Sequence, residues 1–153
     1  MAKLHDYETW FDKGMALEES DKHVEAFACF QKAIEIKPDF IPAWVYQGIS
    51  LEQLQRHDEA LALFDAAIQI NPNVTDLWYN KGATLCMLER YEEALACFDK
   101  VLEIDPNNAI AQTAQCLTLE TLESLKQAQN LVSVNSTYST NVADDTYLLK
   151  RCP

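Results

Sequence analysis

Between residues 75 and 108 the chain reads TDLWYNKGATLCMLERYEEALACFDKVLEIDPNN. The tryptophan, glycine, phenylalanine and proline of this stretch occur twice earlier in the chain, at equal intervals. Each glycine of the protein follows a tryptophan by four residues, and the pairs are Trp10 and Gly14, Trp44 and Gly48, and Trp78 and Gly82. A constant step of about 34 residues is typical of a repeat protein, in which each unit folds in the same way.

Within one unit the apolar residues form two runs separated by a short polar break. In the second unit the runs extend from Trp44 to Leu54 and from Ala60 to Ile68, with polar residues at 55–58 between them. Steps of three and four residues are the period of an α-helix. A proline near the end of each unit stops the second run, because proline cannot continue a helix. Each unit is therefore predicted to be a pair of helices.

The repeated glycine predicts a close approach between the two helices. Glycine in the middle of a helix costs about 1 kcal/mol relative to alanine, so its recurrence indicates that a neighbouring helix leaves no room for a side chain. The expected partners are small residues of the second helix, Ala26, Ala60 and Ala94. The large tryptophan and phenylalanine side chains are expected to fill the space on either side.

These residues resemble the tetratricopeptide repeat (TPR) family, whose pattern is W-x2-L-G-x2-Y, then A-x3-F, then P. In the third unit Trp78, Gly82, Ala94, Phe98 and Pro106 match this pattern. Lysine or glutamine stands where the family has leucine, and leucine stands where it has tyrosine, which are mild changes for packing. The resemblance implies an all-α fold, a right-handed superhelical solenoid of three TPR helix pairs with a C-terminal capping helix.

The resemblance ends at residue 108, and the rest of the chain is expected to cover the end of the stack. A solenoid leaves an apolar face at its last unit, which an atypical terminal element covers. The expected segments are an N-terminal lead-in at 1–6, TPR units at 7–40, 41–74 and 75–108, a capping helix at 109–131 and a flexible tail at 132–153. A decayed fourth helix pair is the alternative, and the absence of Gly, Pro and Asn between 109 and 129 favours one helix.

The end of the tail is rich in polar residues but carries an apolar triplet. One interpretation is a loose terminus. The alternative is that Tyr147, Leu148 and Leu149 dock on the protein itself or on a neighbouring copy.

The overall charge argues against nucleic acid and membrane partners. The chain has 153 residues, with 24 Asp and Glu against 12 Lys and Arg, for a formal net charge of −12. Binding to nucleic acid relies on Lys and Arg that neutralise phosphates, and anionic membranes repel a chain of this charge as well. No apolar leader or spanning stretch is found, so a cytoplasmic protein with reduced thiols is expected.

The chain offers little for catalysis. His23 and His57 occupy equivalent positions in the first and second units, and Tyr91 occupies that position in the third. They are therefore expected to be structural residues at the start of the second helix. Catalysis needs a nucleophile, a base or a metal held in a water-excluding pocket. No catalytic, cofactor-binding or metal-ligating residue is predicted, and the chain is not expected to be an enzyme.

The resemblance to the TPR family implies that the first helices line a concave groove for a protein or peptide. The residues expected to line this groove are Phe11, Asp12, Met15 and Glu19 of the first unit, Val45, Tyr46, Ile49 and Glu52 of the second, and Tyr79, Asn80, Ala83 and Met87 of the third. Some of the apolar residues are expected to pack between neighbouring first helices instead. These helix faces, which also include Glu18 and Asp76, carry carboxylates and no Lys or Arg.

This composition disfavours the best-known TPR mechanism, in which Lys, Arg and Asn grip the C-terminal carboxylate of a chaperone tail. Only Asn80 stands where such an asparagine is expected, because Asp12 and Tyr46 occupy the equivalent places. The predicted ligand is a peptide or helix with apolar anchors and basic residues. The predicted function is that of a non-catalytic adaptor or assembly scaffold. The alternative is a weak structural homo-oligomer assembled through the C-terminal cap or tail.

Overall fold

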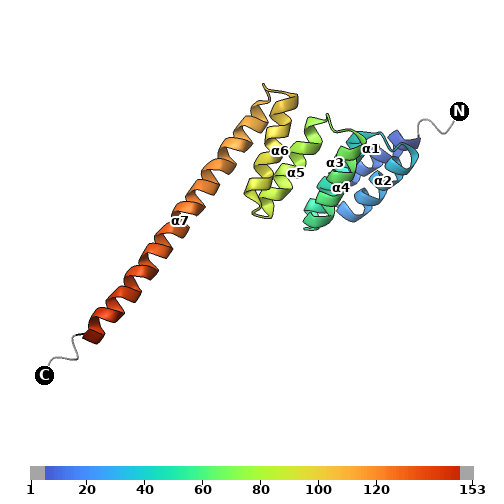
Figure 1. The fold of residues 1–153 in the computed structure, drawn as a ribbon. Coiled ribbons are helices and arrows are strands. Elements are labelled where there is room, and N and C mark those ends of the chain that lie inside the picture. The colour runs from blue at the N-terminus through green and yellow to red at the C-terminus, as the bar shows by residue number, and fades with distance from the viewer. Residues whose placement is uncertain (1–5, 149–153) are drawn as a thin grey trace. The chain divides into compact units, whose positions relative to one another are not determined.

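A computed structural model describes the backbone of residues 6–148 and the side chains of residues 6–136 (Figure 1). This part of the chain consists of helices and turns and contains no strand. The helices are α1 (Asp6–Glu18), α2 (His23–Ile36), α3 (Ile41–Gln53), α4 (His57–Ile70), α5 (Thr75–Met87), α6 (Tyr91–Ile104) and α7 (Ala109–Leu148). The predicted all-α solenoid of three helix pairs with a C-terminal capping helix is confirmed.

The six helices of the repeat region stack in chain order, and each contacts the next (Figure 1). The first helices also contact one another, α1 with α3 and α3 with α5. Within the described part of the chain, no comparable contact joins α2 to α4 or α4 to α6. Because the first helices lie closer together than the second helices, the stack curves with its first helices on the inside.

Each pair turns on one residue with a positive φ. These residues are Asp21, Gln55 and Glu89, with φ of 56°, 59° and 58°. In the second unit the N–H of Arg56 donates to the carbonyl of Leu51 at 2.8 Å, and the N–H of Gln55 donates to the carbonyl of Glu52 at 2.9 Å. This arrangement is the Schellman motif, which satisfies the last carbonyls of a helix before the chain reverses. The same bonds recur in the other two turns.

The three glycines face aromatic rings. A Cβ built on Gly14 would lie 2.5 Å from Cε1 of Phe30, far inside contact distance. The other two pairs with this relation are Gly48 with Phe64 and Gly82 with Phe98. The predicted close approach is confirmed, and the atoms nearest to each glycine belong to the phenylalanine ring and not to the predicted partners, Ala26, Ala60 and Ala94. Those alanines are fully buried, while the space above each glycine belongs to the ring one turn further along the second helix.

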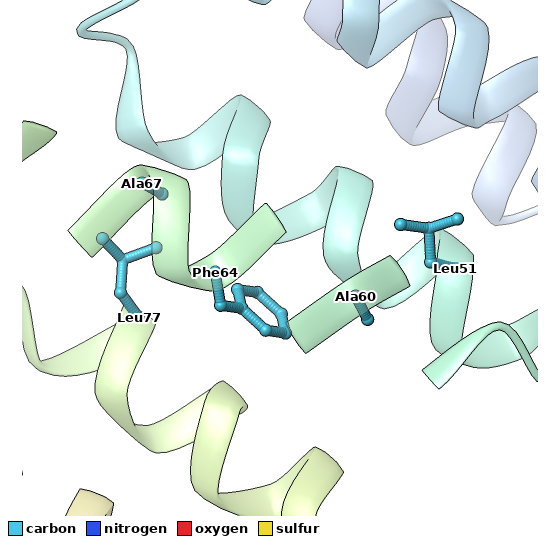
Figure 2. Close-up of a cluster of buried hydrophobic side chains, with 5 residues drawn as sticks. All are labelled: Leu51, Ala60, Phe64, Ala67 and Leu77. Atoms are coloured by element: carbon cyan, nitrogen blue, oxygen red, sulfur yellow. The ribbon is translucent and has the colours of Figure 1, made fainter. Parts of the chain in front are cut away.

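The rings also join one unit to the next. Phe64 of α4 is buried in a cluster with Leu51 of α3, with Ala60 and Ala67 of its own helix, and with Leu77 of α5 (Figure 2). Full burial of a side chain such as Phe64 contributes about 1.5–3 kcal/mol. Because Leu77 comes from the following unit, the core is continuous along the stack rather than divided into separate pairs.

Helix α7 begins as the first helix of a fourth unit. Trp44 and Trp78 each donate an indole N–H to a proline carbonyl six residues earlier, at 2.8 Å. Gln112 of α7 makes the same bond to the carbonyl of Pro106, at 2.9 Å. Gln112 follows Trp78 by the same interval that separates Trp78 from Trp44. The register of the repeats therefore continues into α7, although the tryptophan does not.

The predicted single helix after residue 108 is confirmed, but its predicted end at 131 is wrong. Helix α7 continues to Leu148 through the segment that is predicted to be a tail. Residues 132–148 are rich in Ser, Thr and Asn but contain no Gly or Pro, so nothing in them breaks the helical hydrogen bonds. The predicted flexibility of residues 132–153 stays a prediction. The side chains of Tyr147, Leu148 and Leu149 lie outside the described residues.

The chain divides into two compact units at Thr118, within α7. The first unit contains α1 to α6 and the beginning of α7, and the second begins at Leu119. The exposed large apolar side chains described in the second unit are Leu119, Leu125, Leu131, Val132 and Val134. No helix in the described residues combines the length and the apolar character that crossing a membrane requires.

Candidate functional site

The predicted groove residues lie on α1, α3 and α5, the inner helices of the stack, or directly after α1 in the case of Glu19. The rings of Phe11 and Tyr46 meet edge to face across the first two units, with centroids 5.5 Å apart. Phe11 also contacts Phe30 and Phe40, at 5.6 and 5.2 Å. Aromatic pairs of this geometry stabilise packing. Phe11 and Tyr46 therefore hold neighbouring units together and present only part of their surface to a ligand.

The remaining groove residues differ in how much of each side chain is accessible. Half-buried residues are Met15, Val45, Ile49, Tyr79, Asn80 and Ala83. Exposed residues are Asp12, Glu19 and Met87. The amide of Asn80 donates to the backbone carbonyl of Asp76 at 2.7 Å, so this donor is engaged within its own helix. The accessible apolar surface is concentrated toward the C-terminal end of α5, where Met87 is 52% exposed.

Two of the carboxylates predicted on the groove faces are engaged between units. Glu18 accepts a hydrogen bond from the hydroxyl of Ser50, and Glu52 accepts one from the hydroxyl of Thr84. Both bonds join neighbouring first helices at the same register of the repeat. The recurrence of Ser or Thr at this position was the signal available in the sequence. These carboxylates therefore join neighbouring first helices, and Asp12, Glu19 and Asp76 of the same faces remain exposed.

The histidines open their helices, as predicted. His23 is the first residue of α2 and His57 the first residue of α4. Nδ1 of His23 lies 2.7 Å from Oε2 of Glu18. Nδ1 of His57 is buried and has no partner among the described residues.

Burial raises the pKa of the Glu52 carboxyl. The hydrogen bond from Thr84 and the charge of His57 act in the opposite direction, but they are smaller effects. A carboxyl whose pKa is higher in the folded state than in the unfolded state keeps its proton to a higher pH when folded. Folding therefore becomes less favourable as the pH rises above the ordinary value of 4.5 and through the folded value.

Replacing Glu52 by Gln is expected to raise the melting temperature at pH 8 and to leave it nearly unchanged at pH 4. The amide still accepts from Thr84 but has no charge to desolvate. The expected rise is at most about 2–4 °C, the shift that 1 kcal/mol produces in a protein of this size. Thermal unfolding followed by circular dichroism at both pH values measures it.

Glu59→Gln is the matched control, because the hydrogen bond from Arg56 lowers the pKa of Glu59. That substitution should not stabilise the protein at pH 8. A lower melting temperature for Glu52→Gln at pH 8 would contradict the raised pKa.

A hollow of about 400 Å³ lies between α5 and the beginning of α7. Its lining residues are Tyr79, Ala109, Ile110, Thr113, Ala114 and Leu117. Ile110 is 66% exposed and Leu117 is 59% exposed, so apolar side chains of α7 face solvent beside the ring of Tyr79.

The hollow continues the predicted groove onto α7. Thr113, Ala114 and Leu117 each lie one repeat length after a predicted groove residue, which is Tyr79, Asn80 and Ala83 in turn. The sequence prediction missed them because it interprets the segment after 108 as a cap that only covers α6. Extending the repeat by one more unit identifies them.

A curved stack of helix pairs with a ligand-sized hollow on its inner side defines an α-solenoid repeat protein. Models of the tetratricopeptide repeat match residues 7–40, 41–74 and 75–108. The chain belongs to the tetratricopeptide repeat family. Among curated proteins, none matches this chain.

Three solved TPR domains have the same fold, and two of them carry the name RPAP3. The first TPR domain of human RPAP3 has 24% identity and a TM-score of 0.74, over 80% of this chain and 97% of that one. The first TPR of Spaghetti (RPAP3) bound to the HSP90 peptide SRMEEVD has 23% identity and a TM-score of 0.72, over 78% and 94%. The Sgt2 TPR domain of Aspergillus fumigatus has 15% identity and a TM-score of 0.73, over 79% and 82%. These likenesses establish the fold.

Proposed function

We propose that the protein is a non-catalytic protein-interaction module, an adaptor or assembly scaffold of the cytoplasm. Its ligand is a peptide or helix with apolar and basic residues, held along the inner helices. The observation that carries this proposal is the hollow beside Tyr79, where the exposed Ile110 and Leu117 offer an apolar anchor site. Apolar anchors buried in such a site supply most of the binding free energy of an interface, about 2 kcal/mol or more each.

The charge of the groove supports a basic rather than an acidic ligand. Asp12 and Glu19 are exposed on the first unit, and the groove residues include no Lys or Arg. Opposite charges steer a partner to its site and exclude competitors of the wrong charge. The Spaghetti (RPAP3) domain binds the HSP90 peptide SRMEEVD, and three of the last four residues of that peptide are acids. The groove of this chain is unsuited to such a peptide.

The test is a titration with two labelled probes, an amphipathic peptide of leucine, lysine and alanine and the peptide SRMEEVD. The basic peptide is expected to bind, and the acidic peptide is not. Tyr79→Ala and Leu117→Ala should each weaken binding of the basic peptide by about 30-fold, the factor that 2 kcal/mol corresponds to. Tyr46→Ala should weaken it less, because Tyr46 does not line the hollow.

Tyr91→Ala is the matched control, since Tyr91 is the first residue of α6 and does not line the hollow. It should leave binding unchanged. If the Tyr79 and Leu117 variants bind the basic peptide as well as the original protein does, the groove is not the site. If SRMEEVD binds equally well, the charge of the groove does not select the ligand.

A further inference from the structure

Every unit after the first makes a side-chain bond backward to the preceding second helix. The bonds are Gln47 to Gln31 at 2.7 Å, Lys81 to Asp65 at 2.5 Å and Gln115 to Asp99 at 2.5 Å. The three donors occupy the same position of the repeat, and Lys13 is the equivalent donor of the first unit. Among the described residues, where α1 is the first helix, Lys13 makes no such bond.

The side chains of α1 around Lys13 are at least partly exposed, although their equivalents in the later units pack against a preceding helix. We call Trp10, Lys13, Leu17 and Lys32 the N-terminal face. Nζ of Lys13 lies 5.1 Å from the centre of the Trp10 ring, and Nζ of Lys32 lies 5.3 Å from it. No ion pair joins either lysine to a described carboxylate. Leu17 is partly exposed, whereas its equivalents in the later units are at most 2% exposed.

The later units show what kind of helix covers such a face. Helix α4 presents Leu61 to the cluster of Leu85, and four residues later it presents Asp65 to Nζ of Lys81 at 2.5 Å. A leucine followed at the fourth position by a carboxylate is therefore the complement of the leucine and lysine of a first helix. Residues four apart lie on the same side of a helix, so one helix can supply both.

The described part of α7 contains one exposed pair of this kind. Leu119 of α7 is 43% exposed, and Glu123, four residues later, is exposed. No other leucine of α7 is followed by an acid at the fourth position. The two lysines of the N-terminal face supply a local opposite charge for Glu123, whereas the net charge of −12 on each copy repels the other copy at long range.

We propose that α7 of a second copy docks on the N-terminal face, with Leu119 against Leu17 and Glu123 against Lys13. The predicted alternative is a homo-oligomer assembled through the C-terminal cap, and this contact names the surface that the cap would bind. Two copies that exchange the contact reciprocally form a closed dimer, because each then uses both surfaces. The proposal does not depend on the peptide groove.

Sedimentation velocity of the full chain over a range of concentrations tests the proposal. The average mass is expected to rise above the monomer value of 17.4 kDa with concentration. Lys13→Glu and Glu123→Lys should each weaken the association by at least about tenfold, the factor of 1.4 kcal/mol. The double variant, in which the two charges are exchanged, should recover the association.

Lys100→Glu is the matched control. Lys100 occupies the position of Lys32 two units later, and its replacement changes the net charge by the same amount as Lys13→Glu. It should leave the association unchanged, as should Tyr79→Ala in the groove. A mass that stays at 17.4 kDa at all concentrations overturns the proposal. Association that persists in both single variants, or that the double variant fails to recover, overturns it as well.

Discussion

Gly48→Ala is expected to lower the free energy of unfolding by about 1–3 kcal/mol, although alanine is the better helix former. The added Cβ would overlap the ring of Phe64. That ring is fully buried in a cluster that spans two units, so it has no free space to move into. Without this contact, the same change in the middle of a helix would stabilise the protein by about 0.5–1 kcal/mol. The sign of the effect therefore tests the packing.

Urea unfolding followed by circular dichroism measures this change, and a double-mutant cycle isolates its cause. In a Phe64→Leu background the ring is absent, so Gly48→Ala should cost much less there than in the original protein. A Gly48→Ala variant that is more stable than the original protein would show that the ring yields at little cost. An equal cost in both backgrounds would show that the ring is not the cause.

Alkylation of Cys97 is expected to be at least about 100-fold slower than alkylation of Cys116 at pH 8, because only the thiolate reacts. Burial raises the pKa of the Cys97 thiol to about 11. At pH 8 such a thiol is roughly 0.1% ionised. Cys97 is also 4% exposed, while Cys116 lies exposed on α7.

Timed quenching with iodoacetamide, followed by mass spectrometry of the peptides, measures both rates in one sample. Cys29, at the equivalent buried position of the first unit, serves as an internal comparison and should be slow as well. In urea the three rates should converge, because unfolding removes the burial. Equal rates for Cys97 and Cys116 in the folded protein would contradict the packing of α6.

The fold was predictable because its determinants recur. The constant repeat length places Trp44, Gly48 and Phe64 at contacts that the neighbouring units repeat, so one pattern specifies each helix and each turn. The partner of the glycine was not predictable from spacing alone. Alanine and phenylalanine of the second helix both recur at the right step, and only the direction of the ring decides between them. The extension of α7 to Leu148 was missed because a polar composition without Gly or Pro is compatible with either a tail or a helix.

The sequence was sufficient to place the predicted groove residues on the inner helices, but not to determine the state of their side chains. The helical faces of α1, α3 and α5 follow from the repeat, and so does the continuation to Leu117, once the repeat is extended. The engagement of Glu18 and Glu52 required the contacts between units, since a carboxylate on an inner helix can face either a ligand or a neighbour. Those contacts leave fewer charges available to a ligand than the composition of the groove implies.

The bonds between neighbouring first helices also make the stack unevenly stiff. Its first two joints are tied by a hydroxyl that donates to a carboxylate, at Ser50 and at Thr84. At the third joint the carboxylate is replaced by a thiol, and Sγ of Cys86 lies 3.5 Å from Oγ1 of Thr118. Bonds to ionised acceptors are roughly twice as strong as neutral ones. The elastic compliance of the solenoid is therefore greatest at the joint beside the apolar hollow, so a change of curvature costs least there.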